Sequence, residues 1–172
     1  MFTLLRYSTL TAVLVTLLWA SGCTDQQPSA VAQVHDGKTD TSMDVYKTES
    51  CECCNDWIKH IQQVGFATDI HHPASLDTVK REHGIAPRFQ SCHTAISRAG
   101  YVFEGHVPAR FIQQFLNDPP ADAIGLAVPG MPVGSPGMEI GDRFDPYAVL
   151  LLKKDGSSEI YAEVGSASEQ YP

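Results

Sequence analysis

Cysteine carries most of the reactive chemistry in this chain of 172 residues, which contains five of them. Three lie within four residues, as Cys51, Cys53 and Cys54 of the motif CECC, and Cys92 follows in the motif SCHT. Thiolates are soft ligands that select Cu(I), zinc or iron–sulfur centres over hard cations. Three thiols at one point of the chain therefore predict a metal site, to which Cys92 could add a fourth sulfur.

Structural disulfides are the main alternative, because they are the usual explanation for four cysteines in an exported protein. The spacing resists this explanation, since a direct bridge between the neighbours Cys53 and Cys54 would distort the peptide between them. A bridge from Cys51 to Cys54 is feasible, and it would leave Cys53 for Cys92. We favour a metal site. The spacing alone does not choose between a mononuclear site and a bridged cluster of Cu(I) ions.

Hydrophobic periodicity indicates the elements that must position these cysteines. Strands are expected at residues 44–48, 66–71, 92–97, 101–107, 147–152 and 159–164. Helices are expected at residues 55–64, at 76–83 and from Pro108 onward, and a Gly/Pro-rich loop at 126–141. The order β-α-β-α-β-β-α predicts a thioredoxin-like α/β domain with an added C-terminal β-hairpin. In that topology the strand that begins at Cys92 neighbours the first strand, and the CECC motif lies at a helix start, where thiols tend to ionise.

Four segments of the chain resemble the bacterial CopG-type copper-resistance family. They read CECCNDWIKH (51–60), SCHTA (91–95), GYVFEGHVP (100–108) and VPGMPVGSPGME (128–139). The resemblance covers about residues 44–152 and implies a thioredoxin-like fold and a periplasmic role in copper tolerance. It also implies that the four cysteines hold copper, most readily Cu(I), as a cysteine-bridged cluster.

Histidines and methionines near these motifs are candidates for secondary metal ligands. His60 lies one helical turn after the CECC motif, although a histidine on a helix is more often packed or solvated. His93 follows a cysteine directly, so in a regular strand it would point to the opposite face. Met131 and Met138 carry soft thioethers, and we expect their loop to cover the cluster or admit copper. His106 is expected to be structural.

The N-terminal residues predict export and a lipid anchor. Arg6 precedes an apolar run at residues 10–20, which is too short for a comfortable membrane span and is typical of an export signal at residues 1–22. Small residues before Cys23 resemble a bacterial lipobox, so we expect Cys23 to be acylated. A plain signal peptide would instead leave it as a free thiol. A polar tether is expected at residues 23–42 and the metal-binding domain at 43–172, in the periplasm.

Charge and the absence of other motifs limit the function further. The chain is acidic, with a formal net charge of −8, and has no basic footprint for nucleic acid. Its expected partners are copper ions, other periplasmic copper-handling proteins and the membrane through the anchor. Ag(I) shares the preference of Cu(I) for sulfur. No catalytic residue is assigned, because no acid/base pair, phosphate loop or nucleophilic triad stands out.

The sequence is also compatible with two functions other than copper binding. The first is a periplasmic thiol–disulfide oxidoreductase that uses Cys51 and Cys54, for which a helix start would lower a thiol pKa. Cys53 and Cys92 are not needed by such a two-thiol enzyme. The second is a lipoprotein scaffold held by disulfides that performs no chemistry.

Overall fold

A computed structural model describes residues 40–171, which contain seven strands and three α-helices. The strands are β1 (Ser42–Lys47), β2 (Ala67–His71), β3 (His93–Ser97), β4 (Val102–Gly105), β5 (Ala123–Val128), β6 (Tyr147–Lys153) and β7 (Ser158–Val164). The helices are α1 (Glu52–Gln63), α2 (Leu76–Glu82) and α3 (Ala109–Asn117), with short 3₁₀ turns η1 (Pro87–Phe89) and η2 (Ala167–Gln170). The export signal, Cys23 and most of the tether lie outside the described residues.

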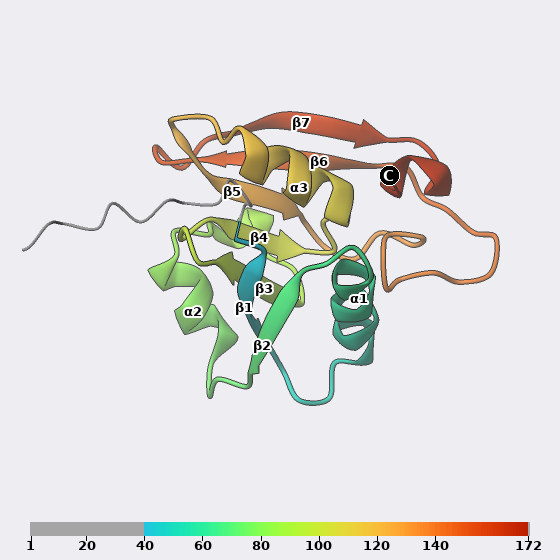
Figure 1. Ribbon diagram of the computed structural model, residues 1–172, viewed down its shortest axis with the longest axis horizontal. Coiled ribbons are helices and arrows are strands. Elements are labelled where there is room, and N and C mark those ends of the chain that lie inside the picture. The colour runs from blue at the N-terminus through green and yellow to red at the C-terminus, as the bar shows by residue number, and fades with distance from the viewer. Residues whose placement is uncertain (1–39, 172) are drawn as a thin grey trace, which may run out of the picture. The chain divides into compact units, whose positions relative to one another are not determined.

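All seven strands form one mixed sheet in the order β2-β1-β3-β4-β5-β6-β7 (Figure 1). The pairs β1–β2 and β4–β5 are parallel, and the other four are antiparallel. In the antiparallel pair β1–β3, Lys47 lies opposite His93, so the start of β3 is beside the end of β1. The antiparallel pair β3–β4 aligns Thr94 with Glu104. This register brings together the segment before β3, which contains Cys92, and the segment after β4, which contains His106.

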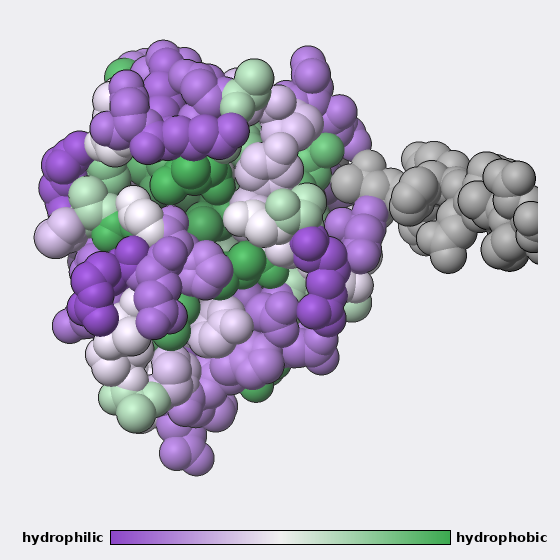
Figure 2. Space-filling view, turned by 90° about the vertical axis from the view of Figure 1, so that its left-hand side faces the viewer, coloured by the Kyte–Doolittle hydropathy of each residue, from purple (hydrophilic) through white to green (hydrophobic). Residues whose placement is uncertain are grey.

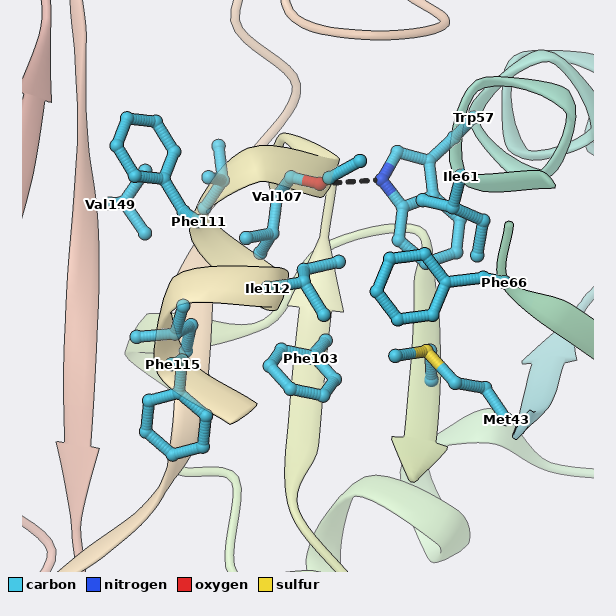
Figure 3. Close-up of a cluster of buried hydrophobic side chains, with 14 of the residues drawn as sticks. Met43, Trp57, Ile61, Phe66, Phe103, Val107, Phe111, Ile112, Phe115 and Val149 are labelled. Carbon is cyan, nitrogen blue, oxygen red and sulfur yellow. Dashed lines mark hydrogen bonds between the residues drawn. The ribbon is translucent and has the colours of Figure 1, made fainter. Parts of the chain in front are cut away.

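Helices α1 and α3 pack on one face of the sheet and form the larger core (Figure 3). Trp57 and Ile61 of α1 and Ile112 of α3 are fully buried there. The Trp57 indole N–H also donates a hydrogen bond of 2.9 Å to the carbonyl oxygen of Val107. Because burying one large apolar side chain contributes roughly 2–3 kcal/mol, this core fixes the position of α1 firmly.

The opposite face of the sheet is covered by the segment that contains α2 and η1. A smaller core there joins Ile85 and Phe89 to Val102 and Leu152 of the sheet. Figure 2 shows the molecule from the side that carries α2, where hydrophilic residues surround a central group of hydrophobic ones. Among residues 40–171, no helix has the length and hydrophobicity needed to span a membrane.

The structure confirms a mixed α/β fold and the hairpin β6–β7, but it adds a strand that was not predicted, β5, and corrects the start of one helix. The expected loop at 126–141 was wrong at its start, because Leu126 to Val128 belong to β5. Strand β5 lies between β4 and β6 and forms its hydrogen bonds with both. The short apolar segment between Pro120 and Pro129 did not by itself indicate a strand. Helix α1 also begins at Glu52, three residues earlier than expected, so it includes Cys53 and Cys54.

Candidate metal site

Four cysteine sulfurs meet where the N-terminus of α1 faces the start of β3. Cys51 is the N-cap residue of α1, Cys53 and Cys54 lie in its first turn, and Cys92 directly precedes β3. Their Sγ atoms all lie within 4.8 Å of one another. We call these four residues the sulfur group. Its geometry brings together all of the primary ligands predicted from the sequence.

Within the sulfur group, Cys51 and Cys54 form a disulfide, whereas Cys53 and Cys92 are free thiols. The Cys53 sulfur lies 3.5 Å from that of Cys51, and the Cys54 sulfur lies 3.9 Å from the carbonyl oxygen of Cys92. Cys54 is fully buried, and the other three are partly exposed. The free backbone N–H groups at the start of α1 favour negative charge on sulfur at this position.

Burial raises the pKa of the Cys92 thiol to about 12, and the nearby Cys53 sulfur adds to this rise. The Cys92 thiol therefore holds its proton at neutral pH. A soft cation that binds this sulfur must displace the proton, so binding would release it to solvent.

A second group of ligand atoms lies on the inner side of Cys92. The Nε2 atom of His106 is 3.0 Å from the Cys92 sulfur, and the Nδ1 atom of His93 is 3.4 Å from it. Both imidazoles are fully buried, and one ligand atom from each of the three residues lies within 4.8 Å of the others. We call Cys92, His93 and His106 the imidazole group. Burial lowers the pKa of both histidines, so both are neutral at physiological pH.

Only a structural role was expected for His106, and its contact with the Cys92 sulfur was not predicted. The β3–β4 register that aligns Thr94 with Glu104 also places His106 opposite Cys92 when it is continued by two residues. His93 was expected to point away from Cys92, but the chain at Cys92 precedes the regular strand, so simple alternation does not apply there. The His93 ring packs on Trp57, with the ring centroids 4.3 Å apart.

A buried polar network supports the segments that carry Cys92 and His106. The Lys80 Nζ atom lies 2.5 Å from the Glu104 carboxylate, which also accepts hydrogen bonds from the Thr94 hydroxyl and the Ser91 backbone N–H. Burial raises the pKa of Glu104, although these donors oppose the rise. Because Ser91 precedes Cys92 and Glu104 lies two residues before His106, the network fixes both sides of the imidazole group.

The loop after β5 packs against the site at three points. The Ser91 hydroxyl donates to the carbonyl oxygen of Gly130, and His106 Nδ1 lies 2.8 Å from that of Pro136. At Gly137, whose φ is +84°, an added Cβ would lie 2.5 Å from the carbonyl oxygen of Cys53. The backbone of this loop is therefore pressed against the first turn of α1, and only glycine allows that approach.

The remaining candidate ligands lie outside both groups of His and Cys ligands. The Nε2 atom of His60 accepts a hydrogen bond of 3.0 Å from the Ala109 backbone N–H, so this imidazole joins α1 to the start of α3. Burial lowers the pKa of His60 to about 4. Met131 is 52% exposed, and Met138 is partly buried at the far end of the same loop.

Fold and site together define a mixed α/β protein with a cysteine-rich candidate metal site. A family model described as "Protein of unknown function, DUF411" matches residues 89–138, which include Cys92, His93 and His106. Two solved structures, titled "Copper resistance protein copG", Form 2 and Form 1, are each 45% identical to this chain, with a TM-score of 0.67. They cover 72% of this chain, and the matches span 97% and 96% of their own chains. The comparison with curated proteins found no match.

At that identity and coverage, the chain belongs to the CopG-type copper-resistance family. The resemblance expected from the four sequence motifs is thereby confirmed.

Proposed function

We propose that this protein binds Cu(I) through the thiolates of Cys51, Cys53, Cys54 and Cys92, in copper resistance or copper relay. The observation that carries the proposal is the convergence of these four sulfur atoms within 4.8 Å of one another. An all-sulfur donor set favours a soft ion, and sulfur can bridge two metals, so a polynuclear cluster is compatible with four ligands. The relatives named copper resistance proteins support copper as the ion.

Copper binding by all four thiolates requires the Cys51–Cys54 disulfide to be reduced. Two electrons and two protons convert the bridge into two thiols, and those thiols lose their protons when metal binds. The oxidised and the four-thiolate forms are therefore mutually exclusive. Copper affinity should depend on the redox state of this one pair of cysteines.

The same disulfide favours one second candidate function, a thiol–disulfide oxidoreductase that uses Cys51 and Cys54. The bridge spans the N-cap and the first turn of α1, where the helix dipole stabilises a released thiolate. The two functions differ in what Cys53 and Cys92 do. Thiol exchange needs neither sulfur, whereas the proposed copper site needs both.

We propose further that the domain has a thioredoxin-like core and that the protein is a lipoprotein of the periplasm. The strand order β2-β1-β3-β4, with α1 joining two parallel strands, supports a thioredoxin-like core. The N-terminal signal and Cys23 support a periplasmic lipoprotein, with other periplasmic copper-handling proteins as partners. Replacing Cys23 with serine should move the protein from the membrane fraction to the soluble periplasmic fraction. Unchanged membrane association would contradict the lipid anchor.

We also propose that the loop carrying Met131 and Met138 admits copper to the sulfur group. Its packing at Pro136 and Gly137 supports a position over the site, and the exposed Met131 thioether offers a soft first contact. Replacing both methionines with leucine should slow Cu(I) transfer from a donor chelator without changing the final stoichiometry. An unchanged transfer rate would remove this role.

The central experiment is an anaerobic Cu(I) titration of the reduced whole chain against a chromogenic chelator. We expect copper to bind tightly and expect Cys53→Ser or Cys92→Ser to lower the affinity at least tenfold, as is typical of changes around a metal site. Cys23→Ser is the matched control, because it removes a sulfur that is not in the group. Insulin reduction by the same samples tests the second function. Turnover without copper binding would favour the oxidoreductase instead.

A further inference from the structure

The hydrogen bonds of His106 fix which of its two nitrogens can bind a metal. Its Nδ1 atom lies 2.8 Å from the carbonyl oxygen of Pro136, and a carbonyl can only accept, so Nδ1 carries the proton. The Nε2 atom then presents a lone pair, 3.0 Å from the Cys92 sulfur. Metal-binding histidines typically donate their other ring N–H to a carbonyl in this way.

His93 provides a second imidazole beside the Cys92 sulfur. The side chain is fully buried, and its Nδ1 atom is 3.4 Å from the Cys92 sulfur. Within residues 40–171, its Nε2 atom has no hydrogen-bond partner. An unpartnered buried nitrogen is costly and requires an explanation. The ring centroids of His93 and His106 are 5.0 Å apart in an edge-to-face arrangement, so the two imidazoles converge on one region.

We infer that Cys92, His93 and His106 form a second copper site, with one thiolate and two imidazole ligands. Its ligand atoms lie within 4.8 Å of one another, and it shares Cys92 with the sulfur group as a bridging sulfur. Imidazole binds both Cu(I) and Cu(II), whereas the all-sulfur group favours Cu(I). The second site therefore accepts copper in either oxidation state. The choice of copper rests on the proposed function, but the ligand geometry does not.

The surroundings keep these three ligands in place. The Glu104 carboxylate holds the Ser91 N–H beside Cys92, and Pro136 holds the His106 ring. At Gly105, whose φ is +74°, an added Cβ would lie 2.5 Å from the Ser91 Cβ, so glycine is needed for this close approach. Such fixed ligands are typical of a site built to hold an ion.

The test separates the two groups by their ligands. In the whole chain, Cys51, Cys53 and Cys54 are replaced by serine, which leaves the imidazole group intact. We expect this triple variant to bind one Cu(I) per chain, with nitrogen and sulfur neighbours in copper K-edge X-ray absorption. Adding His106→Asn should lower the affinity at least tenfold and remove imidazole scattering. The asparagine amide can still donate to the Pro136 carbonyl oxygen, so the loop contact is retained.

Two outcomes would overturn the second site. One is a folded triple variant, verified by circular dichroism, that binds no copper. The other is an affinity unchanged by His106→Asn. The unmodified chain at saturating copper gives a measurement that needs no variant to fold, and it should show imidazole scattering as well as sulfur. If the unmodified chain binds copper but the folded triple variant does not, only the second site fails. If removing the three cysteines leaves the total copper unchanged, the proposed function fails.

Discussion

Cys92 separates two regions that are built in different ways. On one side, Cys51 and Cys53 are partly exposed at the start of a helix, where Cys51 is held by its disulfide to Cys54 and the Cys53 thiol is free. On the other side, His93 and His106 are fully buried. The exposed region depends on local chain geometry, whereas the buried region depends on strand register and an internal ion pair. Substitutions in the first should therefore affect metal binding, and substitutions supporting the second should affect folding as well.

The largest effect on stability is expected for Lys80→Met, which removes one partner of the buried Lys80–Glu104 pair. An uncompensated buried charge costs about 3–5 kcal/mol of unfolding free energy, measured by urea denaturation. Lys59→Met is the matched control, because Lys59 is 69% exposed in its pair with Asp56 and should change stability by less than about 0.5 kcal/mol. Adding Glu104→Leu to Lys80→Met should recover part of the loss. Equal effects of the two lysine substitutions would contradict the contrast between the regions.

A second comparison uses two glycines of the loop after β5. Gly137→Ala combines a strained φ of +84° with a clash against the Cys53 carbonyl oxygen, so we expect a loss of about 2–3 kcal/mol. Gly130→Ala has a similar φ of +69° but open space around the new methyl group, and should cost about 1 kcal/mol. Thermal unfolding measures the difference. If both substitutions cost the same, the loop does not press on α1.

The pH dependence of the unfolding free energy should reveal that His60 is buried in its neutral form. Burial lowers its folded pKa from the ordinary value of 6.5 to about 4, so the unfolded chain binds more protons between these values and stability falls as the pH falls through that window. From pH 6.5 to pH 5 this one group should account for a loss of about 1–2 kcal/mol. His60→Gln keeps an acceptor for the Ala109 N–H and should reduce the slope in this range by the share of His60, while the buried His93 and His106, whose pKa values are also lowered, still contribute. An unchanged slope would show that His60 is not the responsible group.

The smallest effect on folding is expected for Cys53→Ser in the metal-free protein. This sulfur is partly exposed and has no role in the core, so the unfolding free energy should change by less than about 0.5 kcal/mol. The same variant should lose most of its Cu(I) affinity. A loss of several kcal/mol without metal would instead show that Cys53 is structural.

The sequence predicted the exposed region better than the buried one, for a physical reason. Cys51, Cys53 and Cys54 are neighbours in the chain, so their convergence needs only one helix start. The partnership of Cys92 and His106 depends on the β3–β4 register, which the turn at residues 98–100 already constrains. Continuing that predicted hairpin by residue pairs would have placed His106 opposite Cys92.

Other features were beyond the reach of local patterns. Strand β5 is short and lies between prolines, and its identity depends on pairing with β4 and β6. The buried pair of Lys80 and Glu104 joins residues from α2 and β4, and both types are usually exposed. A lysine on a short helix gives no sign from its neighbours that it enters the protein interior.

Copper K-edge X-ray absorption on the reduced whole chain, loaded with one equivalent of Cu(I), tests the central claim most directly. If the sulfur group holds copper, sulfur should dominate the nearest-neighbour shell. That shell should be lost when Cys51, Cys53, Cys54 and Cys92 are all replaced by serine in a chain that still folds. A shell made only of nitrogen and oxygen in the unmodified protein would contradict the account. So would an unchanged number of sulfur neighbours at an unchanged copper affinity in the quadruple variant.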